Sequence, residues 1–209
     1  MLKASRSKQV RKPVSVMLRI ELCDIEPLIW RRIVVPASWA MFALHNYVQW
    51  VMGWRDTHAH EFRIGDQIIA PDWWLKEISL DRDISNDRDE RRVKVASVVS
   101  EAATAGEFEY AYDMGDGWRH RLVVETHIDT PGRRFARLPV CTAGENACPP
   151  DDVGGPPGYA RFLAALADPG HEEHSTMVAW IGGVFDPRGF DLNYLNREWH
   201  VVSVKDQCR

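Results

Sequence analysis

Hydrophobic and polar positions alternate near the start of the chain, which is the pattern of a strand that buries one of its two faces. This alternation runs over residues 14–22. A turn at 24–27 leads into a second apolar stretch at 29–35, and we expect the two stretches to pair as an antiparallel hairpin. Pro36 ends the second strand, because proline has no N–H to donate to a strand ladder.

The spacing of apolar residues then lengthens to three and four, which predicts a helix over residues 39–52. Ser38 is the expected N-cap, and Gly53 is the expected stop because glycine accepts the left-handed conformation that ends many helices. A second hairpin is expected over residues 60–70, with its turn at Gly65-Asp66. The first half of the chain therefore predicts two hairpins separated by a helix.

A third hairpin is predicted over residues 108–125, where two alternating stretches flank an Asp-Met-Gly-Asp-Gly turn at 113–117.

Two other regions lack an alternating pattern of apolar and polar residues. Residues 76–94 hold six acids and six bases and are expected to form a solvated loop. Residues 128–155 are expected to be mostly loop.

Helical spacing returns in the last third of the chain. One helix is expected after Pro156-Pro157, a second from Asp168 to Ile181, and a short third over 191–198. The order of elements predicts a single α+β domain over residues 14–200. We expect a mixed, largely antiparallel sheet, a packed helix after the first hairpin, and C-terminal helices. The expected core includes Met41, Leu44, Val48, Phe62, Phe162, Leu163, Leu166 and Trp180.

Charge adds an asymmetry to this picture. The net charge is −4, but residues 1–13 carry five Lys or Arg and no acid, so the remainder carries −9. We expect 1–13 to be a basic disordered tail and 201–209 to be a second tail. The basic tail is the expected place for weak contact with nucleic acid, since an acidic body disfavours a large phosphate-binding face. The sequence has neither an apolar run of membrane-spanning length nor a signal peptide, so no membrane contact and a cytoplasmic location are expected.

The candidate chemistry lies on the third hairpin. Asp113, Asp116 and His120 fall within eight residues, beside Tyr112 and Trp118. Carboxylate and imidazole ligands suit a divalent metal ion, and a carboxylate–imidazole pair also suits acid–base catalysis. The structural alternative stays open, because Asp and Gly are the residues that a tight turn requires and His120 can pack beside Trp118.

Two further segments carry candidate ligands. His58 and His60 stand at the start of an expected strand, where positions two apart share a face and can point at one ion. Asp151 and Asp152 lie in a loop at 149–158, whose prolines and glycines give it one rigid shape. Each of these residues has a structural alternative, as a surface histidine or as a cap for the helix that follows.

The motifs resemble those of the plasmid pRiA4b ORF-3-like family, some members of which carry the label of insertion-element passenger TnpR-like proteins. The resemblance extends over roughly residues 14–200, with mild departures at Met114, Gly117 and Asp151. It implies no settled activity. The matching blocks are Ile29–Ile33, Leu44-His45, Gly53-Trp54, His58–Phe62, Tyr110–Trp118 with His120, Pro149–Gly155, Phe185–Pro187 and Phe190-Asp191.

Two functions from different classes fit these features. The first is a non-enzymatic binding module with a groove lined by the aromatic residues Trp30, Trp54, Tyr112 and Trp118. The second is a metal-dependent hydrolase or nuclease, with a divalent metal ion as its cofactor. Its expected ligands are Asp113, Asp116, His120 and one of His58 or His60. Convergence of these side chains in space would separate the two.

Overall fold

The structure is a computed structural model that describes residues 15–128 and 138–206. Within these ranges one sheet of eight strands runs through the molecule in the order β5-β4-β3-β6-β7-β1-β2-β8. All neighbouring strands are antiparallel except β4 and β5, which are parallel. The strands are β1 (Ser15–Leu22), β2 (Trp30–Pro36), β3 (His60–Ile64), β4 (Gln67–Ala70), β5 (Arg88–Asp89), β6 (Glu107–Tyr112), β7 (Trp118–Ile128) and β8 (Val140–Glu145).

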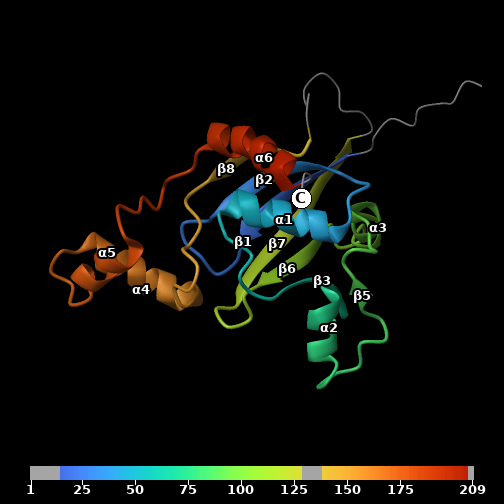
Figure 1. Cartoon of the computed structure of the whole chain (residues 1–209), viewed down its shortest axis with the longest axis horizontal. Helices are drawn as coiled ribbons and strands as arrows, with labels where there is room; N and C mark the ends of the chain where they lie inside the picture. Colours follow the sequence, from blue (N-terminus) through green and yellow to red (C-terminus); the bar gives the residue numbers. More distant parts are fainter. Residues whose placement is uncertain (1–14, 129–137, 207–209) are drawn as a thin grey trace, which may run out of the picture.

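Helices cover one face of this sheet, with α1 lying over it and α6 beside α1 (Figure 1). The predicted α+β fold, with a mixed and largely antiparallel sheet, is confirmed. None of the helices in the described ranges is long and apolar enough to cross a membrane. The basic tail expected at 1–13 lies outside the described residues. The helices are α1 (Met41–Met52), α2 (Asp72–Ile78), α3 (Val95–Glu101), α4 (Gly155–Ala167), α5 (His174–Ile181) and α6 (Leu192–Asp206).

The core forms between the sheet and α1. Alternate residues of β1, from Val16 to Leu22, have no exposed surface, and so do Met41, Leu44 and Val48 on α1. The predicted buried face of this helix is therefore confirmed. Gly53 ends the helix in the left-handed conformation, as expected.

The start of α1 differs from the prediction, because Ala40 and not Ser38 occupies the cap position and no side chain caps the helix. The first N–H groups are instead satisfied by backbone carbonyls, from Met41 to Val93 (3.0 Å) and from Phe42 to Glu90 (3.4 Å). A segment remote in sequence thus replaces the local cap.

That segment is part of the stretch expected to be a solvated loop, and the expectation was wrong for its two ends. The first end lies in α2, and Arg88–Asp89 form β5, which adds to β4 in parallel. The backbone N–H of Glu90 donates to Ala70 (3.1 Å), and the Glu90 side chain is buried. The charged composition concealed this segment because its order comes from pairing with β4, not from an apolar pattern of its own.

Strand β8 was also missed in a region expected to be loop, and residues 129–137 of that region lie outside the described ones.

Buried Arg31 holds the end of β8 against the rest of the fold through hydrogen bonds. Its guanidinium donates at 2.8 Å to the carbonyl oxygens of Val51, Trp30, Glu145 and Asn146. The bonds to Val51, Glu145 and Asn146 join residues far apart in the chain, and they carry no sequence pattern that would reveal the strand.

The C-terminal helices begin or end at residues other than those predicted. Asp168 follows α4 and accepts a bond from Gly170, and α5 begins only at His174. Trp180 is 46% exposed, so its place in the expected core was wrong, although Phe162 is buried as expected. Helices α4 and α5 form a pair that projects to one side of the sheet (Figure 1). A projecting pair shares less apolar surface with the core, which leaves Trp180 at its edge.

Candidate functional site

The segment between α1 and β3 passes between two groups of histidine and carboxylate side chains. Residues 56–60 of this segment supply members to both. The outer cluster consists of His58, Asp113 and Asp152, and the inner cluster of His45, Asp56, His60 and Glu90. His58 and His60 were expected to share a strand face and one ion. They separate because β3 begins at His60, so the alternation of a strand does not extend back to His58.

In the outer cluster the His58 imidazole lies between two carboxylates. Its Nε2 is 3.2 Å from Asp152 Oδ1 and 3.5 Å from Asp113 Oδ2, and the three ligand atoms lie within 4.8 Å of one another. Nε2 is buried, yet neither oxygen, nor any other group in the described ranges, makes a hydrogen bond with it. Nε2 therefore has two carboxylate oxygens at ion-pair distance but is aligned for a hydrogen bond with neither, which makes the outer cluster a candidate cation site.

Asp151 adds a second atom of the same kind. Its Oδ1 is buried and has no hydrogen-bond partner among the residues that the structure describes. Burial raises the pKa of Asp151, the electrostatic interaction with His58 lowers it, and the charge of Asp152 raises it again. Asp151 thus lies near the exposed carboxylate of Asp152, and Arg55 is a cationic side chain that also lowers the pKa of Asp151.

Asp113 is held in place by the hairpin turn. It adopts the left-handed conformation (φ 54°), which aspartate tolerates better than most residues, and its N–H donates to Ala59 (2.9 Å). Oδ1 accepts from the N–H groups of Gly115 (3.0 Å) and Asp116 (3.2 Å), which leaves Oδ2 directed at His58. One carboxylate thus serves both the turn and the cluster.

Asp116, the other expected ligand on the turn, does not join the outer cluster. Its Oδ2 accepts from the N–H of Gly154 (3.0 Å) in the glycine-rich loop. Gly155 lies so close to this turn that an added Cβ would be 2.3 Å from the Asp116 carbonyl oxygen. Asp116 therefore fastens the loop that carries Asp151 and Asp152 to the hairpin that carries Asp113.

His120 does not reach the cluster either, and it is fully buried on β7. Because the Tyr110 carbonyl oxygen can only accept, His120 Nδ1 donates to it (3.1 Å) and Nε2 keeps its lone pair. Burial lowers the pKa of His120 to about 4, although the bond to Tyr110 raises it. This histidine is a neutral core residue.

The aromatic groove that we expected does not form. Trp54, Tyr112 and Trp118 are core residues with at most 6% of their surface exposed. Trp30 lies apart from them, beneath the guanidinium groups of Arg19 (4.6 Å) and Arg32 (5.4 Å). Period-two alternation does not distinguish a ring that lines a groove from one that fills a core.

Two members of the inner cluster, His45 and Asp56, belong to a closed ring of hydrogen bonds with Gln49 and Tyr110, which the sequence interpretation missed. The Asp56 N–H donates to Gln49 Oε1 (3.0 Å), so Nε2 of this amide donates to the Tyr110 hydroxyl (2.8 Å). His45 Nε2 lies 2.9 Å from Asp56 Oδ1, and since a carboxylate only accepts, this nitrogen carries the proton. Tyr110 then donates its own proton to His45 Nδ1 (2.8 Å) and completes the ring.

Electrostatics agree with this order of protons. Burial lowers the pKa of His45, the bond to Asp56 opposes this, and the neutral imidazole results. Burial raises the pKa of Tyr110 well above its ordinary value, so its hydroxyl remains a donor. For Asp56, burial is the largest influence and raises the pKa, but the His45 hydrogen bond and the electrostatic interactions with His45 and His60 together lower it below its ordinary value, so the carboxylate stays ionised.

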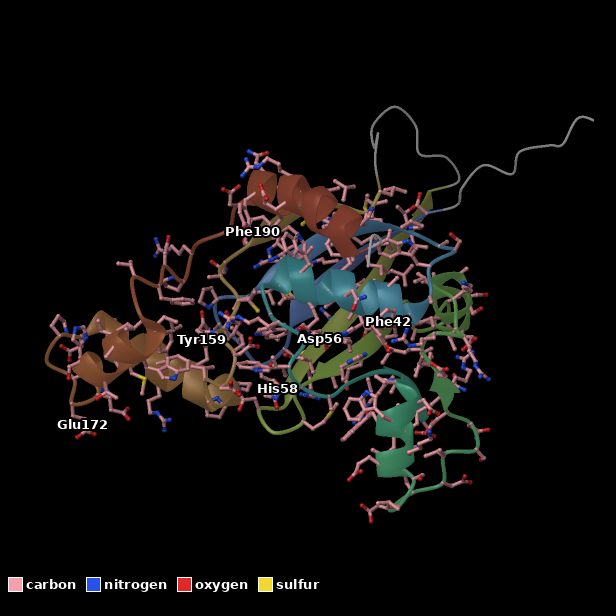
Figure 2. All side chains as sticks on the ribbon, viewed as in Figure 1. Phe42, Asp56, His58, Tyr159, Glu172 and Phe190 are labelled. Carbon is pink, nitrogen blue, oxygen red and sulfur yellow. The ribbon has the colours of Figure 1, made fainter. Side chains whose placement is uncertain are left out.

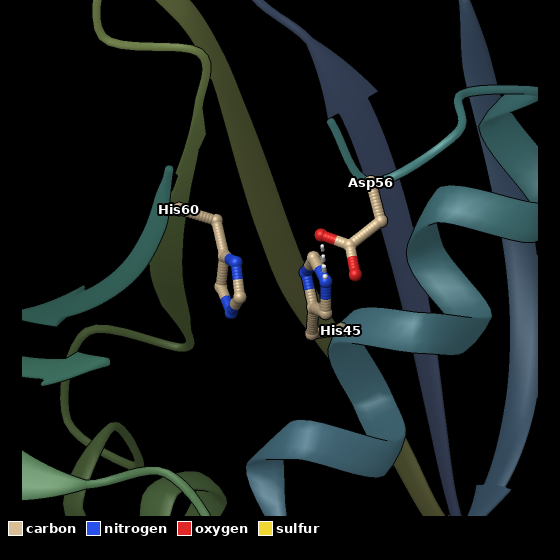
Figure 3. Close-up of side chains that lie close together, drawn as sticks. All are labelled: His45, Asp56 and His60. Atoms are coloured by element: carbon tan, nitrogen blue, oxygen red, sulfur yellow. Dashed lines mark hydrogen bonds and ion pairs between the residues drawn. The ribbon is translucent and has the colours of Figure 1, made fainter. Parts of the chain in front are cut away.

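His60 lies face to face with His45, as Figure 3 shows, with ring centroids 3.4 Å apart and planes within 5°. Its Nε2 donates to buried Glu90 (2.8 Å). A ring lone pair lies in the plane of its own ring, so two parallel rings cannot both direct a lone pair at one ion. The inner cluster is therefore a poor metal chelate, although ligand atoms of His45, Asp56 and His60 lie within 4.8 Å of one another.

The two clusters border one pocket of about 530 Å³. Asp56, His58, His60 and Glu90 line it, opposite Trp73 at the start of α2. In Figure 2, Asp56 and His58 lie close together below α1, whereas Glu172 lies at the far end of the projecting helix pair. A signal for this site was available, because His45 and Gln49 are polar exceptions four residues apart on the apolar face of α1.

Comparisons with known proteins agree with the motif resemblance. The chain is 36% identical over 194 residues to the uncharacterized protein y4hQ of Sinorhizobium fredii, covering 91% of this chain and 93% of that one. The crystal structure of MM3350, a protein of unknown function from Methanosarcina mazei Go1, matches with a TM-score of 0.72 and 31% identity. That match covers 87% of this chain and 97% of MM3350. Since the plasmid pRiA4b ORF-3-like protein family also matches residues 15–194, the chain belongs to that family.

Proposed function

We propose that the protein is a metal-dependent hydrolase that binds a divalent cation through His58, Asp113 and Asp152. The observation that carries this proposal is the buried Nε2 of His58, which lies between two carboxylates without a hydrogen bond in the described structure. A cation among these atoms would satisfy the nitrogen and would relieve the repulsion between the acids. Small shifts would bring the ligand atoms to the ~2.0–2.2 Å of metal–ligand bonds.

The ligand set indicates the kind of metal. One imidazole and two carboxylates are borderline to hard ligands, which suit Mn²⁺, Fe²⁺ or Zn²⁺. Asp151 is a candidate fourth ligand, because its orphaned Oδ1 belongs to a residue whose pKa responds to all three members of the outer cluster.

Exposure favours catalysis over a structural role for this metal. The Asp152 side chain is 72% exposed and that of His58 is 28% exposed, so the site is open on one side. Catalytic sites keep such an open position for water and substrate, and a bound divalent metal lowers the pKa of its water toward neutrality.

Metal titration of the metal-free protein tests the first half of the proposal. Wild-type protein should bind Mn²⁺ or Zn²⁺ in isothermal titration, and the His58→Ala and Asp152→Asn variants should lose that binding. His171→Ala is the matched control, since this histidine precedes α5 in the projecting helix pair. No binding of Mn²⁺, Zn²⁺ or Mg²⁺ at millimolar concentration by the wild type would refute the proposal, as would unchanged binding by both variants.

Catalytic turnover tests the second half of the proposal, namely that the protein is a hydrolase. With the bound metal, the protein should hydrolyse a nitrophenyl ester, phosphomonoester or phosphodiester, and His58→Ala should abolish this activity. Hydrolysis of the phosphodiester would favour the nuclease form of the proposal. Metal binding without turnover of any of the three would instead favour the non-enzymatic binding module.

A further inference from the structure

We propose that the pocket beside the inner cluster binds a small organic cation that carries N–H donors, of the guanidinium or alkylammonium type. His58 of the outer cluster also lines this pocket, but the ligand would lie against the inner cluster, and the proposal does not require a metal. It rests on the order of protons in the inner cluster, on the charges of the pocket lining and on the aromatic rings in its wall.

The order of protons leaves acceptors on the pocket floor. His45 Nε2 donates to Asp56 Oδ1, and the other Asp56 oxygen belongs to a side chain that is 49% exposed in the pocket. His60 uses Nε2 to donate to Glu90, so in its neutral form Nδ1 is an acceptor. A ligand that lies on this floor must therefore bring the hydrogen-bond donors.

The charges of the lining favour a cation as the carrier of these donors. The lining holds three carboxylates, those of Asp56, Asp72 and Glu90, against one guanidinium, that of Arg91. Lys76 pairs with Asp72 from outside the pocket, but both side chains are more than 60% exposed, and such pairs are weak. A ligand carboxylate or phosphate would face this excess of negative charge, so anionic ligands are disfavoured.

The aromatic residues of the wall suit a flat cation. Trp73 is 57% exposed and lines the pocket together with Phe42. Arg91 already lies over the Phe42 ring, with its guanidinium carbon 4.0 Å from the ring centroid. Trp73 offers a second ring face for the same kind of contact. A pocket of about 530 Å³ also has the size that small ligands occupy.

The probe pair n-butylguanidinium and n-butylurea tests this proposal, since the two have nearly the same shape and differ in charge. Titrations at pH 8 in the presence of EDTA keep histidines neutral and remove metal. We expect n-butylguanidinium to bind and to quench tryptophan fluorescence, and n-butylurea to bind at least about tenfold more weakly.

Three variants locate the binding. Asp56→Asn should weaken n-butylguanidinium binding by at least about tenfold, because it removes the charge while Asn still tolerates the left-handed backbone at φ 56°. Asp72→Asn is a second test, at an exposed side chain that is not part of the inner cluster. Trp73→Ala should weaken binding about threefold. Asp81→Asn and Leu80→Ala are exposed controls outside the pocket lining and should change nothing.

Four outcomes would overturn the proposal. They are no binding of n-butylguanidinium at 10 mM (about the weakest affinity of interest for a small ligand), equal binding of n-butylurea, unchanged binding by both Asp variants, and binding that EDTA abolishes. Binding that EDTA abolishes would mean that a bound metal ion, and not the carboxylates of the lining, holds the ligand. Since the expected binding is measured without metal, failure here leaves the metal proposal standing, and failure of the metal titration leaves this one standing.

Discussion

The two histidine–carboxylate clusters contain the same residue types and lie on opposite sides of one short segment. They differ in whether their polar atoms have hydrogen-bond partners. In the hydrogen-bond ring of the inner cluster each bond determines the next, so that both ring nitrogens of His45 and the hydroxyl of Tyr110 have partners. In the outer cluster the His58 nitrogen faces two acids and has no hydrogen bond within the described structure. Unused bonding capacity at ligand atoms that lie close together, more than residue type, therefore separates a site for an ion from a scaffold that shapes a pocket.

The largest expected effect comes from breaking the buried pair of the inner cluster. Glu90→Ala leaves the His60 Nε2–H buried without its acceptor, and should lower the free energy of unfolding by about 3–5 kcal/mol. Urea denaturation measures this loss. Glu101→Ala is the matched control, because its pair with Arg88 is exposed and should be worth less than about 1 kcal/mol. Equal effects of the two variants would contradict the assigned role of Glu90.

Acidification should weaken the inner region before any ligand is involved. The pKa of His120 is lowered to about 4 and that of His45 is also lowered, whereas an unfolded histidine titrates near 6.5. The unfolded state thus binds more protons below pH ~6.5, so stability should be full above that pH and should fall as the pH drops toward about 4. His120 alone should account for roughly 3 kcal/mol.

Urea denaturation at a series of pH values from 8 to 4 checks this dependence. His120→Gln should flatten the curve within that window, although it starts from a lower stability at pH 8. A wild type whose unfolding free energy stays constant down to pH 4 would mean that these histidines are accessible to protons in the folded state.

Removing the hydroxyl that closes the hydrogen-bond ring should have an intermediate effect. Tyr110→Phe leaves the Gln49 amide without its acceptor and His45 Nδ1 without its donor, both in the core. The expected cost is about 1–3 kcal/mol, read from the urea midpoint. Phe108→Leu, which alters a buried ring of the same strand without a polar partner, measures the cost of repacking alone.

The smallest effect on stability is expected in the outer cluster. Asp152→Asn removes one of two neighbouring acids at a side chain that is 72% exposed, so the metal-free protein should change by less than about 0.5 kcal/mol. With Mn²⁺ at 100 times its Kd, the wild type should gain about 2.7 kcal/mol and the variant should gain far less. A large loss of stability without metal would make Asp152 a structural residue instead.

Much of the architecture could be predicted from the sequence because it depends on local patterns. Apolar spacing and Gly53 predicted α1, and turn residues predicted the hairpin that carries Asp113 and Asp116. The prediction failed where order comes from distant partners. Strand β5 is two residues long and exists by pairing with β4, and the N-terminus of α1 is capped by carbonyls some fifty residues further along the chain.

Patterns within short stretches of the chain were enough to predict the hairpins, the central helix, the acidic loop and the unusual polar residues beside them. Which of these residues meet depends on how the elements pack. His58 meets Asp113 and Asp152, His60 meets Glu90, and His45 meets Tyr110 across 65 positions of the chain. Local propensity acts over a few residues, whereas a site is assembled by sheet register and packing. Those bring side chains together without leaving any spacing in the sequence that records the contact.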